Sequence, residues 1–212
     1  PGIAEGYTTA ATALAGENYV VNTLDLQTQR LVPKSTGEEV GDRASDEVSP
    51  SVIVIAGPTK DLLPGEADRL QDYMVLGGRM LLLVDPETPE TFRRYLNTWG
   101  IELGQGNIFE EEDYLRPDNR IPFITNHNPN LELSQGLGRT FFPGLAPITP
   151  IQDIPMVEVV GQQVNRLVPQ VLSITSSNSW LVEDDDRSEP DKENDARGPF
   201  FTGARVQGLA PI

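Results

Sequence analysis

The chain contains no cysteine and a single histidine, His127, among its 212 residues. The absence of cysteine excludes disulfides, thiolate metal sites and cysteine nucleophiles. One histidine cannot supply a transition-metal cluster, and His127 lies in the turn-like sequence Asn-His-Asn-Pro. No G-x-S-x-G nucleophile motif accompanies it. We therefore expect no metal, no cofactor and no enzymatic activity.

Long apolar runs and basic residues are also scarce. No stretch approaches the ~20 apolar residues that cross a bilayer, and the start at Pro1-Gly2 has no secretory leader. We expect an excised soluble fragment whose membrane segments lie elsewhere. The 32 acidic and 16 basic residues give a formal net charge of −16. Such a field repels phosphate groups, so nucleic acid and anionic lipid headgroups are poor partners.

Nucleotide-binding motifs are missing as well. Gly57-Pro58-Thr59-Lys60 follows an apolar run but does not match the G-x-x-x-x-G-K-[ST] loop, and its proline removes a backbone donor. No G-x-G-x-x-G sequence opens a helix. Nucleotide chemistry is therefore not expected.

The first half alternates helix and strand signals. Apolar spacing predicts an amphipathic helix ending near Gly16. The β-rich composition of residues 19–26 predicts a strand, and the Pro, Ser, Gly and charged residues of 33–50 predict a solvated loop. Two short apolar runs, 51–56 and 79–84, favour strands buried on both faces of a parallel sheet. Helices are predicted between these runs and after the second run, with inward stripes of Leu63, Ala67, Leu70, Met74 and of Phe92, Tyr95, Leu96, Trp99.

This order predicts a doubly wound α/β fold with a mostly parallel sheet. We expect one domain over 1–212, with the α/β core in 1–106 and a loop-rich insertion in 107–170. Late strands then fill 171–212 and enclose a mobile acidic loop at 183–197.

Ligands of doubly wound sheets bind outside the carboxyl ends of the strands. Two loops follow the predicted parallel strands at that edge, and Trp180 at a later strand end could stack on a sugar. The candidate ligand-binding residues are Gly57, Pro58, Thr59, Asp85, Glu87 and Trp180. Asp85-Pro86 also fits a plain turn, and a tryptophan at a strand end also fits the core.

Several motifs in the chain resemble the GldG-like auxiliary proteins of ABC transport systems. The family pattern is an apolar strand ending in A-G-P, a helix, then G-G-R, an apolar strand and D-P. In this chain the corresponding residues are Ala56-Gly57-Pro58, Gly77-Gly78-Arg79 and Asp85-Pro86. Leu96 to Leu103, Leu172 to Trp180 and Gly198-Pro199-Phe200 resemble further segments of the family, so the likeness covers nearly the whole chain.

The resemblance implies a flavodoxin-like, class I glutamine-amidotransferase-like fold on the extracytoplasmic side of the bacterial membrane. It also implies a permease and an ATPase as partners, with flanking helices as the membrane anchor. Amidotransferases of this fold use a cysteine, which this chain lacks. The family's first strand and its closing G-D-S-D-F-like segment are not found, so we expect that first strand to come from elsewhere, for instance from a second copy in a homo-oligomer.

Three functions remain open at this point. The first is a non-catalytic interaction or ligand-sensing domain of an ABC-transporter auxiliary protein. The second is a carbohydrate- or small-molecule-binding domain with its pocket at the sheet edge, and the third is a hydrolase that uses carboxylates alone. A flat acidic edge would favour the first and a closed cavity the second, whereas two facing carboxylates would favour the third.

Overall fold

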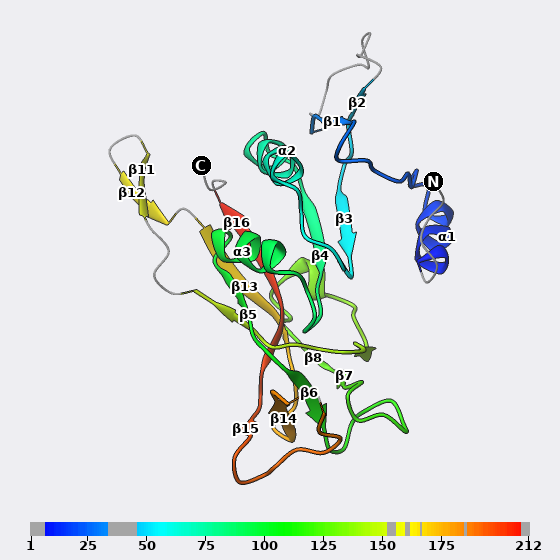
Figure 1. Cartoon of the computed structure of the whole chain (residues 1–212), viewed down its shortest axis with the longest axis vertical. Coiled ribbons are helices and arrows are strands. Elements are labelled where there is room, and N and C mark those ends of the chain that lie inside the picture. Colours follow the sequence, from blue (N-terminus) through cyan, green and yellow to red (C-terminus); the bar gives the residue numbers. More distant parts are fainter. Residues whose placement is uncertain are drawn as a thin grey trace. The chain divides into compact units, whose positions relative to one another are not determined.

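The computed structural model describes residues 7–33, 46–151, 156–159, 162–165, 167–184 and 186–208 (Figure 1). One compact unit, Pro1–Ser51 with Leu63–Gly78, contains α1 (Thr8–Gly16), β1 (Arg30–Leu31), β2 (Glu47–Val48) and α2 (Pro64–Val75). The other, Val52–Leu62 with Arg79–Ile212, begins with β3 (Ile53–Ala56), β4 (Met80–Leu83), α3 (Glu90–Thr98), β5 (Ile101–Leu103) and β6 (Asn107–Glu110).

The second unit continues with short strands and one 3₁₀ turn. In chain order these are β7 (Phe123–Ile124), β8 (Asn126–His127), η1 (Glu132–Ser134), β9 (Thr140–Phe141), β10 (Ile148–Pro150), β11 (Met156–Val159), β12 (Gln162–Asn165), β13 (Leu167–Ile174), β14 (Ser179–Val182), β15 (Ala196–Arg197) and β16 (Phe201–Gly208). Residues 34–45 of the predicted loop and Asp185 of the acidic loop lie outside the described residues.

In the first unit, α2 has clear boundary signals. The Glu66 carboxylate accepts a hydrogen bond from Leu63 N at 2.9 Å, which satisfies a donor at the start of the helix. Leu70 and Tyr73 are fully buried. A Cβ on Gly78 would lie 2.2 Å from the Tyr73 ring, so a glycine is required where the chain leaves the helix. The predicted helix is confirmed, but Leu63 of its predicted inward stripe is 53% exposed.

The prediction of a strand over residues 19–26 is wrong, since none of these residues belongs to a strand. Tyr19 and Val20 are exposed, at 62% and 86%. Asp25 begins a turn, because its carboxylate accepts a hydrogen bond from Gln27 N at 2.9 Å. An aspartate that bonds nearby backbone in this way competes with strand pairing. The helix before it forms as predicted, but α1 has no buried residue.

In the second unit, β3 and β4 form the parallel pair that the sequence predicts, with Ile53 opposite Met80. Residues paired in a parallel ladder point to the same face, and alternate residues point to opposite faces. Ile53 is 5% exposed, whereas Val54 and Leu81 on the other face are 54% and 49% exposed. The prediction that both faces of these strands are buried is therefore wrong.

The predicted doubly wound, mostly parallel, flavodoxin-like fold is also wrong. Within the described residues, the β1–β2 and β3–β4 ladders are parallel and the other ladders are antiparallel. In the same described residues, helix is confined to α1, α2, α3 and the 3₁₀ turn η1. Adjacent parallel strands need a crossover, usually a helix, whereas antiparallel strands can follow one another through short turns. No α-helix follows α3 among the described residues, so the later strands pair mainly with reversed direction.

Two apolar clusters form the core of the second unit. One joins β5 to β10 through Ile101, Leu103, Ala146 and Ile148, and the other consists of Ile108, Ile124 and Leu145. Full burial of each isoleucine or leucine in these clusters contributes about 1.5–3 kcal/mol. The long β13 pairs with β16, beside which it lies in Figure 1, and with β8 at its end. These sheets bring residues far apart in the sequence into contact.

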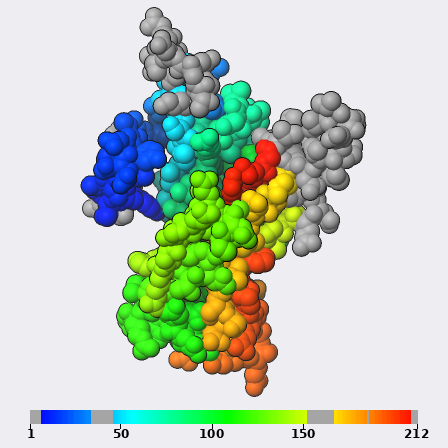
Figure 2. Space-filling model, turned by 180° about the vertical axis from the view of Figure 1, so that it is seen from behind, coloured from blue at the N-terminus to red at the C-terminus, as the bar shows by residue number. Residues whose placement is uncertain are grey.

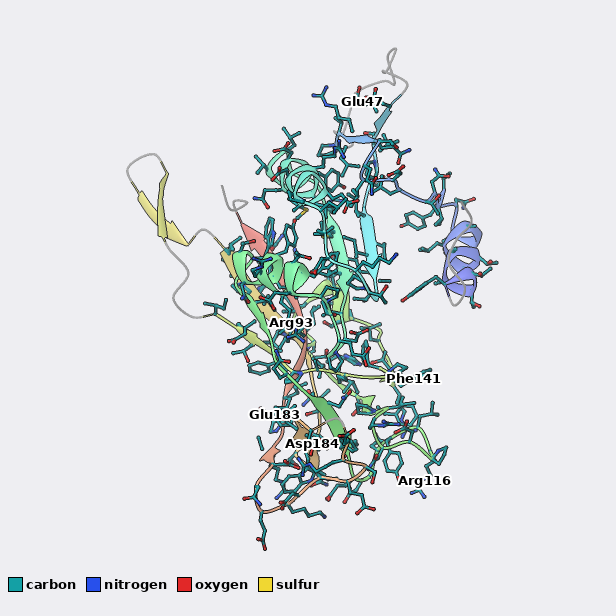
Figure 3. All side chains as sticks on the ribbon, in the orientation of Figure 1. Glu47, Arg93, Arg116, Phe141, Glu183 and Asp184 are labelled. Atoms are coloured by element: carbon teal, nitrogen blue, oxygen red, sulfur yellow. The ribbon has the colours of Figure 1, made fainter. Side chains whose placement is uncertain are left out.

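Arg93 of α3, labelled in Figure 3, ties the helix to two backbone segments. Its guanidinium donates to Pro86 O and Thr88 O at 2.5 and 3.1 Å. It also donates to Leu103 O and Gly104 O at 2.8 and 3.2 Å. The planar fork of arginine carries several donors that diverge in one plane, so one side chain can bond both segments. Arg93 therefore fixes the turn after β4 relative to the end of β5.

The acidic loop between β14 and β15 begins at Glu183 and Asp184, both labelled in Figure 3. Arg187 pairs with Asp195 at 2.5 Å, and this hydrogen bond holds the pKa of Asp195 below its ordinary value. The Asp191 carboxylate accepts a further hydrogen bond from Glu193 N at 3.0 Å. These contacts organise a loop that the sequence predicts to be mobile.

Candidate functional site

The two loops of the predicted site, after β3 and after β4, lie at the same end of the parallel ladder. Gly57 N donates to Leu83 O at 3.0 Å. Asp85 faces its own turn, because Thr88 Oγ1 accepts from Asp85 N at 3.0 Å and donates to Asp85 Oδ1 at 3.3 Å. Asp85 thus closes the turn into α3. A ligand role at this edge stays a prediction for Gly57, Pro58, Asp85 and the exposed Thr59 and Glu87.

Trp180 lies in a different sheet from these loops. In β14 it is opposite Phe109 of β6 and Arg197 of β15. The Arg197 guanidinium lies 5.6 Å from the centre of the indole ring, and Trp180 is 8% exposed. This environment matches the alternative that Trp180 belongs to the core.

A hydroxyl-rich turn, residues 175–178, joins β13 to β14 and is fixed by a buried carboxylate. Glu110 is 1% exposed and accepts a hydrogen bond from Ser176 Oγ at 2.7 Å. It also accepts from the backbone N–H groups of Glu111 and Glu112, at 3.1 and 3.4 Å. Burying a carboxylate is costly unless its oxygens are hydrogen-bonded. These donors offset that cost and hold Ser176 in one position.

Both ends of the turn are held by a second set of buried hydroxyls. The oxygens of Thr175 and Ser179 lie 2.7 Å apart, and Phe200 N donates to Thr175 Oγ1 at 2.8 Å. Gly198 N donates to Ser179 O at 2.8 Å. A Cβ on Gly198 would lie 2.1 Å from Ser179 Oγ, so a larger residue would displace the turn.

A cavity of about 390 Å³ opens beside this turn, within the second unit. Its size falls in the range of about 300–1,000 Å³ that is typical of small-molecule sites. In Figure 2 the orange segment that contains the turn lies against the green segment that follows β6. The lining residues come from both segments and are Asp113, Phe123, Thr125, Asn126, Ile174, Thr175, Ser176, Ser177 and Pro199.

Arg139 lies against two residues of this lining. Its guanidinium pairs with the Asp113 carboxylate and lies 3.7 Å from the centre of the Phe123 ring. Phe123 is opposite Phe141, labelled in Figure 3, and the two rings meet edge to face at 6.0 Å. The cavity therefore has polar walls, one aromatic ring and one ion pair.

His127 hydrogen-bonds through Nε2 to Gly138 O at 3.0 Å. In the described part of the chain, no three His, Asp or Glu side chains lie close enough together to hold a metal ion. None of the described helices has both the length and the apolar character of a membrane span.

No sequence pattern predicted the cavity as a whole. The run Thr175-Ser176-Ser177 gave a signal for one wall, since three adjacent hydroxyls follow a predicted strand. Asp113, Phe123 and residues 125–126 gave none, because they lie in short strands and loops without a sustained period.

No family model matches the chain, and no curated protein matches it. Among solved structures the chain is similar to one described as "mmIFT52 N-terminal domain", with 16% sequence identity and a TM-score of 0.45. The match covers 60% of this chain and 54% of that one, so the chain spans about half of the length of that structure. A likeness of this size carries no information on function.

Proposed function

We propose that this chain is a non-catalytic ligand-sensing domain that binds a small polyhydroxyl compound, such as a sugar, in the cavity beside residues 175–178. The observation that carries the proposal is the lining, in which six of nine residues bear a hydroxyl, amide or carboxylate group. Hydroxyl and amide groups both donate and accept hydrogen bonds, as the hydroxyls of a sugar require. Phe123 adds an apolar surface for the C–H face of a ring.

The rigidity of the turn also supports binding. Ser176 is held by buried Glu110, and Thr175 is held by Ser179 and Phe200 N. Polar groups that are fixed before the ligand arrives lose little conformational entropy when it binds. Thr175 is 2% exposed and shapes the wall, whereas the exposed Ser176 donates to Glu110, accepts from Asn178 N and keeps one oxygen lone pair for a ligand hydrogen bond.

We further propose that the domain works on the extracytoplasmic side of the membrane beside an ABC transporter, with a permease and an ATPase as its partners. The support is the sequence resemblance carried by Ala56-Gly57-Pro58, Gly77-Gly78-Arg79 and Asp85-Pro86. Purification of the full-length protein from membranes tests this association. Recovery of the protein with neither a permease nor an ATPase would reject it.

Titration of the purified chain with glucose, galactose, mannose and myo-inositol, followed by ¹H–¹⁵N NMR, tests the cavity. We expect at least one of them to shift the amide signals of Thr125, Asn126, Ser176 and Ser177. Asn126→Ala should weaken that binding about fivefold, the effect of one hydrogen bond of ~1 kcal/mol.

The matched control is Asn130→Ala, at an exposed asparagine outside the lining. It should leave the affinity unchanged. The proposal fails if none of the four compounds binds, or if the shifted amides lie away from the lining.

A further inference from the structure

Arg139 supplies a cation to a cavity whose nine lining residues include no basic side chain. It comes from outside the lining, just before β9, and its guanidinium contacts both the Asp113 carboxylate and the face of Phe123. A carboxylate beside an aromatic face is an environment that favours a cation. The position that Arg139 occupies is therefore chemically suited to a positively charged ligand group.

This inference rests on the proposed function and narrows its ligand class. We propose that the cavity prefers a polyhydroxyl compound with a positive charge, an amino sugar, and that Arg139 is the internal cation that such a ligand displaces. The ammonium group of the ligand takes the place of the guanidinium beside Asp113. Its ring then covers Phe123, while its hydroxyls reach Thr125, Asn126 and Ser176.

Displacing Arg139 costs little, because its interactions are open to solvent. The Arg139 and Asp113 side chains are 53% and 40% exposed, and exposed ion pairs are weak. The contact between the guanidinium and an exposed aromatic ring contributes only about 0.5–1 kcal/mol. An acidic sugar would instead place a second negative charge near Asp113, in a chain whose formal net charge is already −16.

The test compares glucosamine, glucose and glucuronate by NMR titration of the whole chain at about pH 6, where the amine is protonated. The native chain should bind glucosamine about threefold or more tightly than glucose, and glucuronate most weakly. Arg139→Ala should raise the affinity for glucosamine threefold to tenfold above that of the native chain. This is the factor expected if the ligand no longer has to break the contacts of Arg139 with Asp113 and Phe123. Asp113→Asn should bring the ratio between glucosamine and glucose to about one.

Arg120→Ala is the matched control. Arg120 is also 53% exposed and pairs with an aspartate, Asp118, at 3.0 Å, but neither residue lines the cavity. It should change none of the three affinities, and circular dichroism checks that each variant folds.

The outcomes separate the two proposals. Equal binding of glucose and glucosamine by the native chain overturns this inference and leaves the proposed function standing. Two other results would also overturn this inference alone: weaker glucosamine binding after Arg139→Ala, and a preference for glucosamine over glucose that persists in Asp113→Asn. Binding of no sugar at all by either the native chain or Arg139→Ala rejects both proposals.

Discussion

Arg93→Lys tests whether the guanidinium of α3 joins two backbone segments. The variant keeps the positive charge but replaces a planar fork by a single ammonium group. Arg93 bonds Pro86 O and Thr88 O on one side, and Leu103 O and Gly104 O on the other. One ammonium nitrogen cannot reach both pairs, so we expect one pair of hydrogen bonds to be lost.

The size of the effect follows from those bonds. A hydrogen bond to a charged group contributes about 1.5–3 kcal/mol, and part of that is recovered where water reaches the freed carbonyls. The loss of two bonds should therefore lower the free energy of unfolding by about 2–4 kcal/mol. For a chain of this size each kcal/mol shifts Tm by roughly 2–4 °C, so Tm should fall by about 5–15 °C.

Guanidinium chloride unfolding, followed by circular dichroism, measures this difference in the free energy of unfolding. Arg94→Lys is the control, because Arg94 is the exposed neighbour on the same helix. It should change stability by no more than about 0.5 kcal/mol. If Arg93→Lys were equally mild, the contacts to the four carbonyls would not stabilise the fold, and the reasoning would be refuted.

Gly198→Ala should destabilise the chain by about 2–3 kcal/mol in chemical denaturation, because the new methyl group would overlap Ser179 Oγ. Gly65→Ala, where a Cβ meets nothing within 4 Å, should leave stability unchanged or slightly raised. Burial raises the pKa of Tyr95 to about 12, against an opposing contribution from Trp99. Because the folded chain holds the Tyr95 proton more tightly than the unfolded chain, the contribution of the neutral phenol to the free energy of unfolding should be complete below about pH 10. It should be lost as the pH rises through about 12. Phenolate absorbance, compared with Tyr95→Phe, follows this titration, and ionisation of Tyr95 near pH 10 would contradict it.

Local elements with strong end signals were predictable from the sequence. The helices α2 and α3 and the strands β3 and β4 were all predicted close to their observed positions. In each case the signal lies within a few residues, as an apolar period, a proline at a helix start or a glycine after its end. Such signals determine local backbone conformation and do not depend on contacts with residues far away in the sequence.

The incorrect predictions concern which segments pair or pack against one another in the folded chain. Residues 19–26 have the composition of a strand, but Asp25 forms a local turn and no strand results. The apolar residues of β3 and β4 gave no sign that Val54 and Leu81 would remain exposed, because composition does not say what covers a face. The parallel architecture inferred from the first hundred residues did not extend to the second half, where antiparallel ladders dominate.

By itself the sequence determined the positions of the local elements and the chemistry that is absent, since a chain without cysteine cannot use a thiolate. The tertiary structure decided the strand pairing and the candidate site. Glu110 holds Ser176, a residue of the cavity wall, through a hydrogen bond across 66 residues of sequence, and the two meet only because β6 pairs with β14. Backbone N–H and C=O groups are alike in every strand, so the pairing depends on how the whole chain packs rather than on a local pattern.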